Sequence, residues 1–235
     1  MIAVSRCAKP LALCRKATSW LRDLQTATTA AERKRAEKRY NCSGVRTALE
    51  KMFHGKCAYC ESAIVHVGYP HIEHFRPKVH YPELTFEWEN LLLACSVCNS
   101  SRHKGDKFPI RAGVPLLINP CVDDPSDHFE FTYDRTARVA SVYGKTERGR
   151  TAETMLGLNR AELRDHRSLH VRRLVVLAQT AASDPQAGDL LDEACFSSSE
   201  YAAFARAVKQ RYASSRLPMN LNEDGEAVSG GEVIG

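Results

Sequence analysis

Two Cys-x-x-Cys pairs are the residues of this chain whose type and spacing most clearly predict chemistry. Cys57 and Cys60 form the first pair, Cys95 and Cys98 form the second, and 34 residues separate the two pairs. Thiolates at this spacing are the tetrahedral ligand set of a zinc site, with two ligands from each of two tight turns. Four protein ligands leave no open coordination position, so the predicted zinc is structural.

The segment between and just after the two pairs contains side chains suited to hydrolysing a phosphodiester. The pKa of His74 suits deprotonation of water near neutral pH, and Glu73 is its neighbour. Side chains alternate along a strand, so one of the two can hold a divalent ion while the other faces the substrate. Asn99 and His103 lie four residues apart, hence on one face of an expected short helix. With Glu73 they form a predicted ligand set for a catalytic divalent ion.

Basic residues around this segment are predicted to bind phosphate groups. They are Arg76, Lys78, Lys104 and Lys107. A third histidine, His71, alternates with Glu73 on the same strand face and is a weaker candidate ligand. For His71 a structural polar role is the favoured interpretation.

The predicted fold class is α+β. Helices are expected from about 11 to 24, from 30 to 40, and from 43 to 54, where Ser43 is the expected N-cap and Gly55 ends the helix. The sequence HIEHF then predicts a strand, residues 76–89 a loop, Asn90 the start of a second strand (LLLAC), and residues 99–104 a short helix. Strand, loop, strand and short helix form a ββα finger, which a zinc ion would stabilise.

The C-terminal half is predicted to contain a β-hairpin and several helices. Apolar residues alternate through FEFTY and VASVY, which predicts the hairpin. Helices are expected over 151–158, from an N-cap at Asn159 to about 182, and over 199–212. The expected regions are 1–56 (basic, helical), 57–112 (zinc-stapled core), 113–145 (hairpin), 146–214 (helical) and 215–235 (disordered tail).

Charge is unevenly distributed along the chain. Residues 1–56 carry 13 Lys and Arg against 4 Asp and Glu, a net of +9, whereas residues 121–235 carry 14 against 18, a net of −4. A basic region on a neutral core favours a polyanionic substrate, and residues 33–39 form its basic helix face. A solvated helix face would have the same composition.

Composition also indicates a cellular compartment. No apolar run approaches the roughly 20 residues of a membrane span, and no signal peptide is evident. Nine cysteines without an export signal indicate a reducing compartment, so a cytoplasmic location and no membrane partner are expected.

Taken together, the motifs CAYC, EHFRPK, WENL and CSVCN resemble the HNH endonucleases, the ββα-metal nuclease family. The runs CAYCE, IEHFRPK, WENLLLAC, KGDKFP and LINPCVDDP more closely resemble the PtuB-type HNH subunits of Septu anti-phage defence systems, which also occur in retron-linked versions. The likeness covers about residues 45–130. The three signature positions would be His74, Asn90 and Asn99, the last of which replaces a histidine found in many members.

The resemblance implies a role for each of these residues. His74 would be the general base, Glu73 and Asn99 would hold a catalytic Mg²⁺ or Mn²⁺, and Asn90 would orient His74 by pinning the loop. Asn99 ranks above His103 as the last ligand, although both remain candidates. The implied activity is endonuclease cleavage of nucleic acid, with DNA favoured over RNA.

The resemblance also implies a partner, an ABC-type ATPase that controls the nuclease. This sequence contains no Walker-type phosphate loop, so the ATPase would be a separate subunit. The alternative is a non-catalytic zinc module that binds nucleic acid or a partner protein. Such a module would have no need of Glu73, His74 and Asn99.

Overall fold

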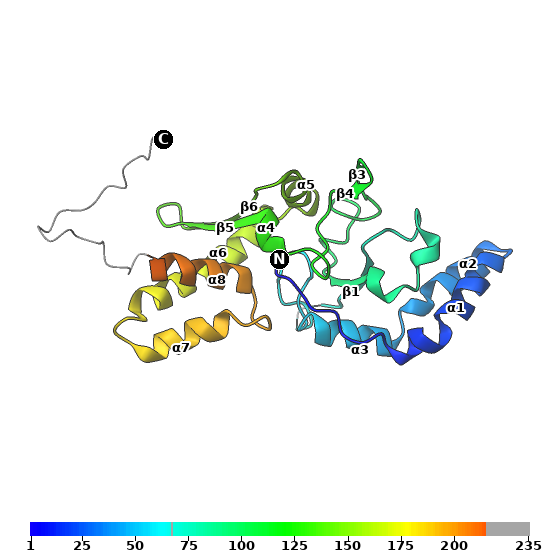
Figure 1. Ribbon diagram of the computed structural model, residues 1–235, viewed down its shortest axis with the longest axis horizontal. Helices are drawn as coiled ribbons and strands as arrows, with labels where there is room; N and C mark the ends of the chain where they lie inside the picture. The colour runs from blue at the N-terminus through cyan, green and yellow to red at the C-terminus, as the bar shows by residue number, and fades with distance from the viewer. Residues whose placement is uncertain (67, 215–235) are drawn as a thin grey trace, which may run out of the picture.

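The structure is a computed structural model that describes residues 1–66 and 68–214. The predicted disordered tail, residues 215–235, lies outside the described residues. Figure 1 shows an elongated molecule, with N-terminal helices at one end, C-terminal helices at the other, and the cysteine-containing segment between them.

The N-terminal end is built from three α-helices and a short 3-10 helix. They are α1 (Leu11–Thr26), α2 (Ala30–Glu37), η1 (Lys38–Tyr40) and α3 (Ser43–Met52). A capping box between Thr29 and Glu32 starts α2. The prediction that Ser43 caps α3 is wrong, because Cys42 occupies the N-cap position without a side-chain bond. After Met52 the chain turns at Gly55, which has a φ of +67° and therefore suits glycine.

The central segment contains two short antiparallel strands, β1 (His71–His74) and β2 (Leu91–Ala94). Their register pairs Glu73 with Leu92 and His74 with Leu91. Two 3-10 helices, η2 (Pro82–Leu84) and η3 (Trp88–Asn90), lie in the connection between the strands. The helix predicted over residues 99–104 is absent, because these residues form turns and bends.

Beyond the second cysteine pair, short strands and one hairpin lead to the C-terminal helices. These elements are β3 (Ile110–Arg111), β4 (Val114–Pro115), α4 (Pro125–His128), β5 (Phe129–Asp134), β6 (Val139–Gly144) and α5 (Glu147–Leu156). β5 and β6 pair antiparallel from Phe129 opposite Gly144 to Asp134 opposite Val139. The hairpin contacts α5 and α6 through β6, and α8 through β5.

Three helices complete the described chain: α6 (Ala161–Thr180), α7 (Pro185–Ala194) and α8 (Ala202–Ser214). Asn159 does not cap α6, since Arg160 is the N-cap residue. The Asn159 amide instead donates to the backbone oxygen of Val142 and to Glu153. On α6, Arg167 is buried and donates to the backbone oxygens of Leu158 and Ala140.

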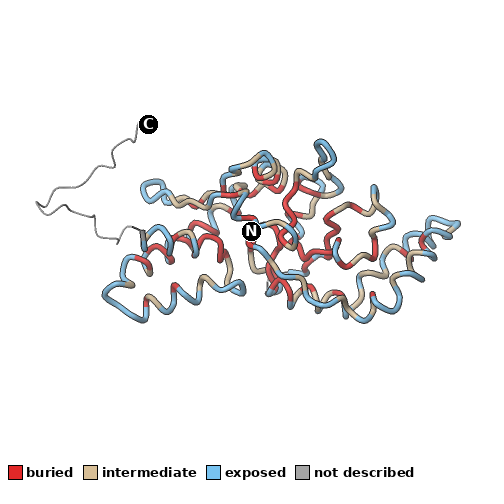
Figure 2. Tube along the Cα trace, viewed as in Figure 1, coloured by how far each residue is buried: buried red, intermediate tan, exposed pale blue. Residues whose placement is uncertain are grey.

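A single large cluster of buried apolar residues joins the two ends of the molecule. It extends from Leu13 and Leu24 on α1, through all four paired cysteines and β2, to Phe204 on α8. Figure 2 shows the buried trace concentrated in the middle and on the inner faces of the terminal helices. Within residues 1–66 and 68–214, no helix is long and apolar enough to cross a bilayer.

Candidate metal centre and active site

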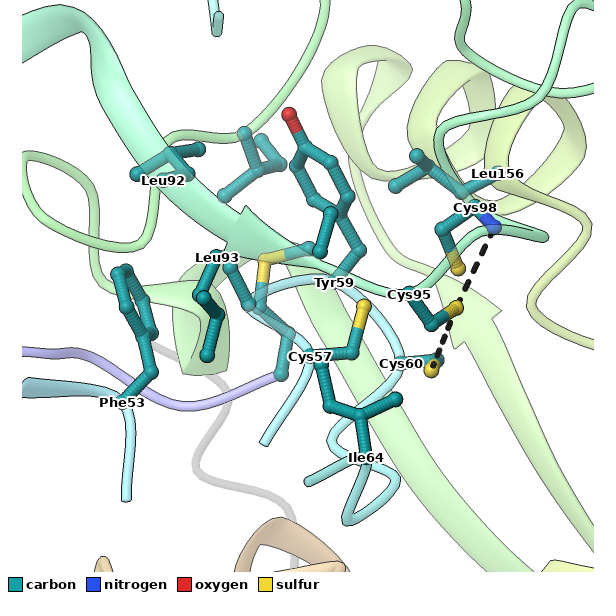
Figure 3. Packing of buried hydrophobic residues seen from close by; sticks show 14 of the residues in the cluster. Phe53, Cys57, Tyr59, Cys60, Ile64, Leu92, Leu93, Cys95, Cys98 and Leu156 are labelled. Atoms are coloured by element: carbon teal, nitrogen blue, oxygen red, sulfur yellow. Dashed lines mark hydrogen bonds between the residues drawn. The ribbon is translucent and has the colours of Figure 1, made fainter. Parts of the chain in front are cut away.

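The four paired cysteines converge in the core. Their sulfur atoms all lie within 4.8 Å of one another, and Cys60 Sγ is 4.0 Å from Cys95 Sγ. Tetrahedral zinc with Zn–S bonds of 2.3 Å would place sulfurs about 3.8 Å apart, so the cluster fits a zinc ion with little adjustment. Figure 3 shows the sulfurs of the four cysteines gathered close to one another. Within the described chain, these cysteines are the one group of three or more Cys, His, Asp or Glu side chains that converges in this way.

The surroundings of the thiols suit a structural ion. Burial raises the pKa of Cys57, whereas hydrogen bonds with neighbouring thiols lower the pKa of Cys60. Zinc would hold all four side chains as thiolates. The Arg160 guanidinium donates to Cys98 Sγ at 3.7 Å and supplies positive charge beside the cluster. Because Arg160 lies 62 residues after Cys98, no local sequence pattern could have indicated this contact.

His74 ends β1 with its imidazole buried and its tautomer fixed. Nε2 lies 3.0 Å from the backbone oxygen of Thr85. A carbonyl oxygen can only accept, so Nε2 carries the hydrogen and Nδ1 keeps its lone pair. The ring of Tyr40 packs edge-on at 4.5 Å between centroids. Burial lowers the pKa of His74 to about 4, so the ring is neutral at pH 7, the state that a proton acceptor requires.

Glu73 is also buried and forms an ion pair that the sequence did not suggest. The Lys104 ammonium contacts Glu73 Oε1 and donates to the backbone oxygen of His74 at 2.9 Å. The Tyr59 hydroxyl is 3.5 Å from the same carboxylate oxygen. Burial raises the pKa of Glu73 to about 7 although Lys104 opposes the shift. Lys104 has a side-chain exposure of 0%, so the prediction that it meets phosphate on the surface is corrected.

Asn90 joins the start of β2 to the loop that follows β1. Its side-chain oxygen accepts from the backbone nitrogen of Arg76 at 2.8 Å, and its amide donates to the backbone oxygens of Arg76 and Leu84. These bonds hold the chain on both sides of the loop. They are the contacts that a residue pinning the loop around His74 requires.

The structure separates the two candidates for the last ligand of a catalytic ion. The Asn99 side chain lies 3.3 Å from Nδ1 of His71. His103 is buried, with Nδ1 3.2 Å from Ser100 Oγ and Nε2 against the αL-conformation Gly157. Burial and the charge of Arg160 both lower the pKa of His103. The expectation that Asn99 and His103 share a helix face is corrected, because their segment is not helical.

The other basic residues differ in how freely they could meet a phosphate. The Arg76 guanidinium lies 5.3 Å from the ring centre of Tyr81 and 5.0 Å from that of Phe108. Lys78 pairs with Glu37 of α2 at 2.9 Å. Lys107 is exposed and donates to a backbone oxygen at 3.1 Å. Since Glu37 meets Lys78 and Tyr40 meets His74, the basic α2–η1 segment lies beside the candidate active site.

The segment that contains both candidate metal sites matches a known protein family. Residues 57–105 match the family model described as HNH endonuclease. This segment is HNH-like. It contains both cysteine pairs and all three predicted signature positions, so the resemblance read from the motifs is confirmed.

Curated relatives extend the likeness beyond the HNH domain. The chain is 38% identical to Septu protein PtuB of Bacillus mycoides (strain KBAB4) over 155 residues, which are 55% of this chain and 51% of that protein. It is 37% identical to Septu protein PtuB of Bacillus thuringiensis over 122 residues, 50% of this chain and 42% of that protein.

A third relative has a different name. Septu protein PtuA of Bacillus mycoides (strain KBAB4) is 30% identical over 147 residues, which are 51% of this chain and 20% of that protein. The chain thus spans about half the length of the PtuB relatives it matches. The names of these relatives support a Septu connection and give the retron link no support.

Proposed function

We propose that this protein is a nuclease effector of a Septu-type anti-phage defence system that hydrolyses phosphodiester bonds of nucleic acid, with DNA favoured over RNA. The observation that carries the proposal is the neutral imidazole of His74, held in one tautomer within an HNH domain. A zinc module that only binds would not require a buried, oriented base.

In the proposed mechanism, Nδ1 of His74 accepts a proton from the attacking water. The Thr85 carbonyl oxygen keeps the ring oriented and stabilises the imidazolium that forms. Asn90 holds the loop that carries the neighbouring backbone. Glu73 and Asn99 would hold a Mg²⁺ or Mn²⁺ ion, which supplies charge neutralisation at the scissile phosphate. Their oxygen donors are the type that these hard cations prefer.

Nucleic acid is proposed to approach across α2. Lys34, Arg35 and Lys38 are exposed on the α2–η1 segment, whose Tyr40 contacts His74. Arg33 and Arg39 instead pair with Glu37 and Asp23. Replacing the three exposed cations by alanine should weaken DNA binding and reduce its dependence on salt, because each neutralised phosphate releases counterions. A DNA affinity that does not change with salt concentration would contradict the proposal that nucleic acid approaches across α2.

Each region of the chain has a proposed role. Residues 57–112 would be the nuclease core and 113–145 its extension, while regions 1–56 and 146–214 offer helices for docking a separate ABC-type ATPase. Names of the PtuB and PtuA relatives support a system with more than one component. A cytoplasmic location is proposed, because thiolate ligands require a reducing compartment.

A cleavage assay on zinc-loaded protein with Mg²⁺ or Mn²⁺ tests the proposal, with and without the product of any neighbouring ATPase gene. His74→Ala should abolish cleavage and leave the zinc content unchanged. His80→Ala is the matched control, because His80 is an exposed histidine six residues further along. If His74→Ala cuts as well as wild type, the proposed mechanism is wrong.

One observation favours the alternative, a non-catalytic zinc module. Glu73 pairs with Lys104, so an internal cation already occupies one oxygen of the predicted metal ligand. The same assay separates the two functions. A binding module would retain DNA in a gel-shift experiment, would not cut it under any of these conditions, and would be insensitive to His74→Ala.

A further inference from the structure

His71 and Asn99 approach each other from two separate parts of the HNH domain. His71 begins β1, and Asn99 lies in the turn that follows the second cysteine pair. Their side chains meet at 3.3 Å between His71 Nδ1 and Asn99 Nδ2. His71 is exposed and Asn99 is half-buried, so an ion and its waters can reach the pair from solvent.

The geometry of this pair suits two neighbouring ligands of one hard cation. The oxygen and nitrogen of an asparagine amide exchange places when the amide rotates by half a turn. When His71 carries its hydrogen on Nε2, Oδ1 then faces the lone pair of Nδ1, and a cation between the two atoms stabilises the arrangement. Adjacent ligands of an octahedral ion with bonds of about 2.1 Å are about 3.0 Å apart, close to the observed separation.

Strand alternation makes Glu73 the candidate third donor. His71 and Glu73 are two residues apart on β1, so their side chains share a face of the strand. Lys104 and Tyr59 both contact Oε1 of Glu73, which leaves Oε2 for a further partner. One carboxylate oxygen, one amide oxygen and one imidazole nitrogen, completed by water, form a ligand set typical of Mn²⁺ or Mg²⁺.

His103 does not offer this geometry. Its Nδ1 is occupied by Ser100 and its Nε2 lies against Gly157, where a Cβ atom would approach to 2.5 Å. The nearby cationic Arg160, which donates to Cys98, makes its surroundings unfavourable for a second cation. His103 therefore packs the junction between the cysteine pair and α5.

We propose that His71, together with Asn99 and Glu73, ligates the divalent ion of the HNH site, and that His103 does not. The inference rests on the proposed function for the role of the ion. It nevertheless concerns binding, which can be measured without any cleavage.

The test uses full-length, zinc-loaded protein and Mn²⁺ as the probe. Electron spin echo measurements detect an imidazole nitrogen bound to Mn²⁺, and titration gives the Mn²⁺ affinity. We expect a nitrogen coupling in the wild type that His71→Ala removes, with an affinity at least about tenfold weaker. His103→Ala and the surface control His80→Ala should keep both the coupling and the affinity. Because His71 is exposed, its replacement should leave zinc content and circular dichroism unchanged.

A coupling that survives in His71→Ala, or that disappears in His103→Ala, would overturn the inference, as would a wild type that binds no Mn²⁺. The two proposals can fail separately. If wild type cuts DNA and His74→Ala does not, while His71→Ala keeps its nitrogen coupling, the function holds and the ligand assignment fails. If no cleavage occurs with any partner but the coupling depends on His71, the ligand assignment holds and the function fails.

Discussion

Replacing Lys104 by methionine should destabilise the protein by about 3–5 kcal/mol, because it leaves the buried carboxylate of Glu73 without its cation. The Lys104 side chain has no exposed surface, and the Glu73 side chain is 4% exposed. The ammonium group also donates to the backbone oxygens of His74 and Gly105. For a chain of this size the loss corresponds to a melting temperature lower by roughly 6–20 °C.

A double-mutant cycle isolates the ion pair from the lost backbone bonds. Glu73→Gln removes the charge that Lys104 neutralises, so the double mutant should be less destabilised than the sum of the single mutants by about 1.5–3 kcal/mol. Lys107→Met is the matched control, since Lys107 is exposed three residues away, and its replacement should cost less than about 0.5 kcal/mol.

The measurement is urea unfolding of zinc-loaded protein followed by tryptophan fluorescence, at several pH values. The folded-state pKa of Glu73 is about 7 with Lys104 present, and removing the cation raises it further. A carboxyl group with a raised folded pKa binds more protons when folded, so the deficit of Lys104→Met should grow as the pH rises through 7. If the stability losses of Lys104→Met and Glu73→Gln are additive, or if the loss in Lys104→Met does not depend on pH, the buried ion pair is refuted.

Three other perturbations have defined outcomes. Chelation of zinc should unfold the central segment, because structural zinc contributes on the order of 10 kcal/mol to folding. Unfolding would shift the fluorescence emission of the buried Trp88 to longer wavelength, and unchanged emission would contradict the prediction. Gly157→Ala should lower the free energy of unfolding, measured by thermal denaturation, by about 2 kcal/mol, because residue 157 has a φ of +56° and an added Cβ would clash with His103. Adding His103→Ala should restore only the part of this loss that comes from the clash. Arg148 donates to Asp123 at 2.8 Å; burial raises the pKa of Asp123, but bonds from Arg148 and the Asn119 backbone lower it below its ordinary 3.8. The stability advantage of wild type over Asp123→Asn should therefore be present above pH 3.8 and disappear as the pH falls through the lower folded pKa.

Features with a strong local signal could be predicted from the sequence. The two cysteine pairs indicated one metal site, and their sulfurs converge within 4.8 Å. Alternating and apolar runs indicated strands, and HIEH and LLLA are β1 and β2. Both signals depend on spacing of a few residues, which backbone geometry fixes without reference to the rest of the chain. The sequence did not predict helix α7, because Asp184-Pro185 is typical of a helix end, whereas here Asp184 caps the start of the next helix.

Neighbouring residues 103 and 104 show why the rest of the site could not be predicted. A helix over residues 99–104 would have put Asn99 and His103 on one face, yet two serines with modest helix propensity and Gly105, at a φ of +44°, favour a compact turn. That turn directs Lys104 inward to Glu73, 31 residues earlier, and His103 toward Gly157, 54 residues later. From residue type alone, Lys104 is predicted to bind phosphate and His103 to bind a metal ion. Their actual partners, the buried carboxylate of Glu73 and the helix-capping Gly157, are distant in sequence and leave no pattern within the motif. The roles of the polar residues in the motif therefore follow from tertiary packing.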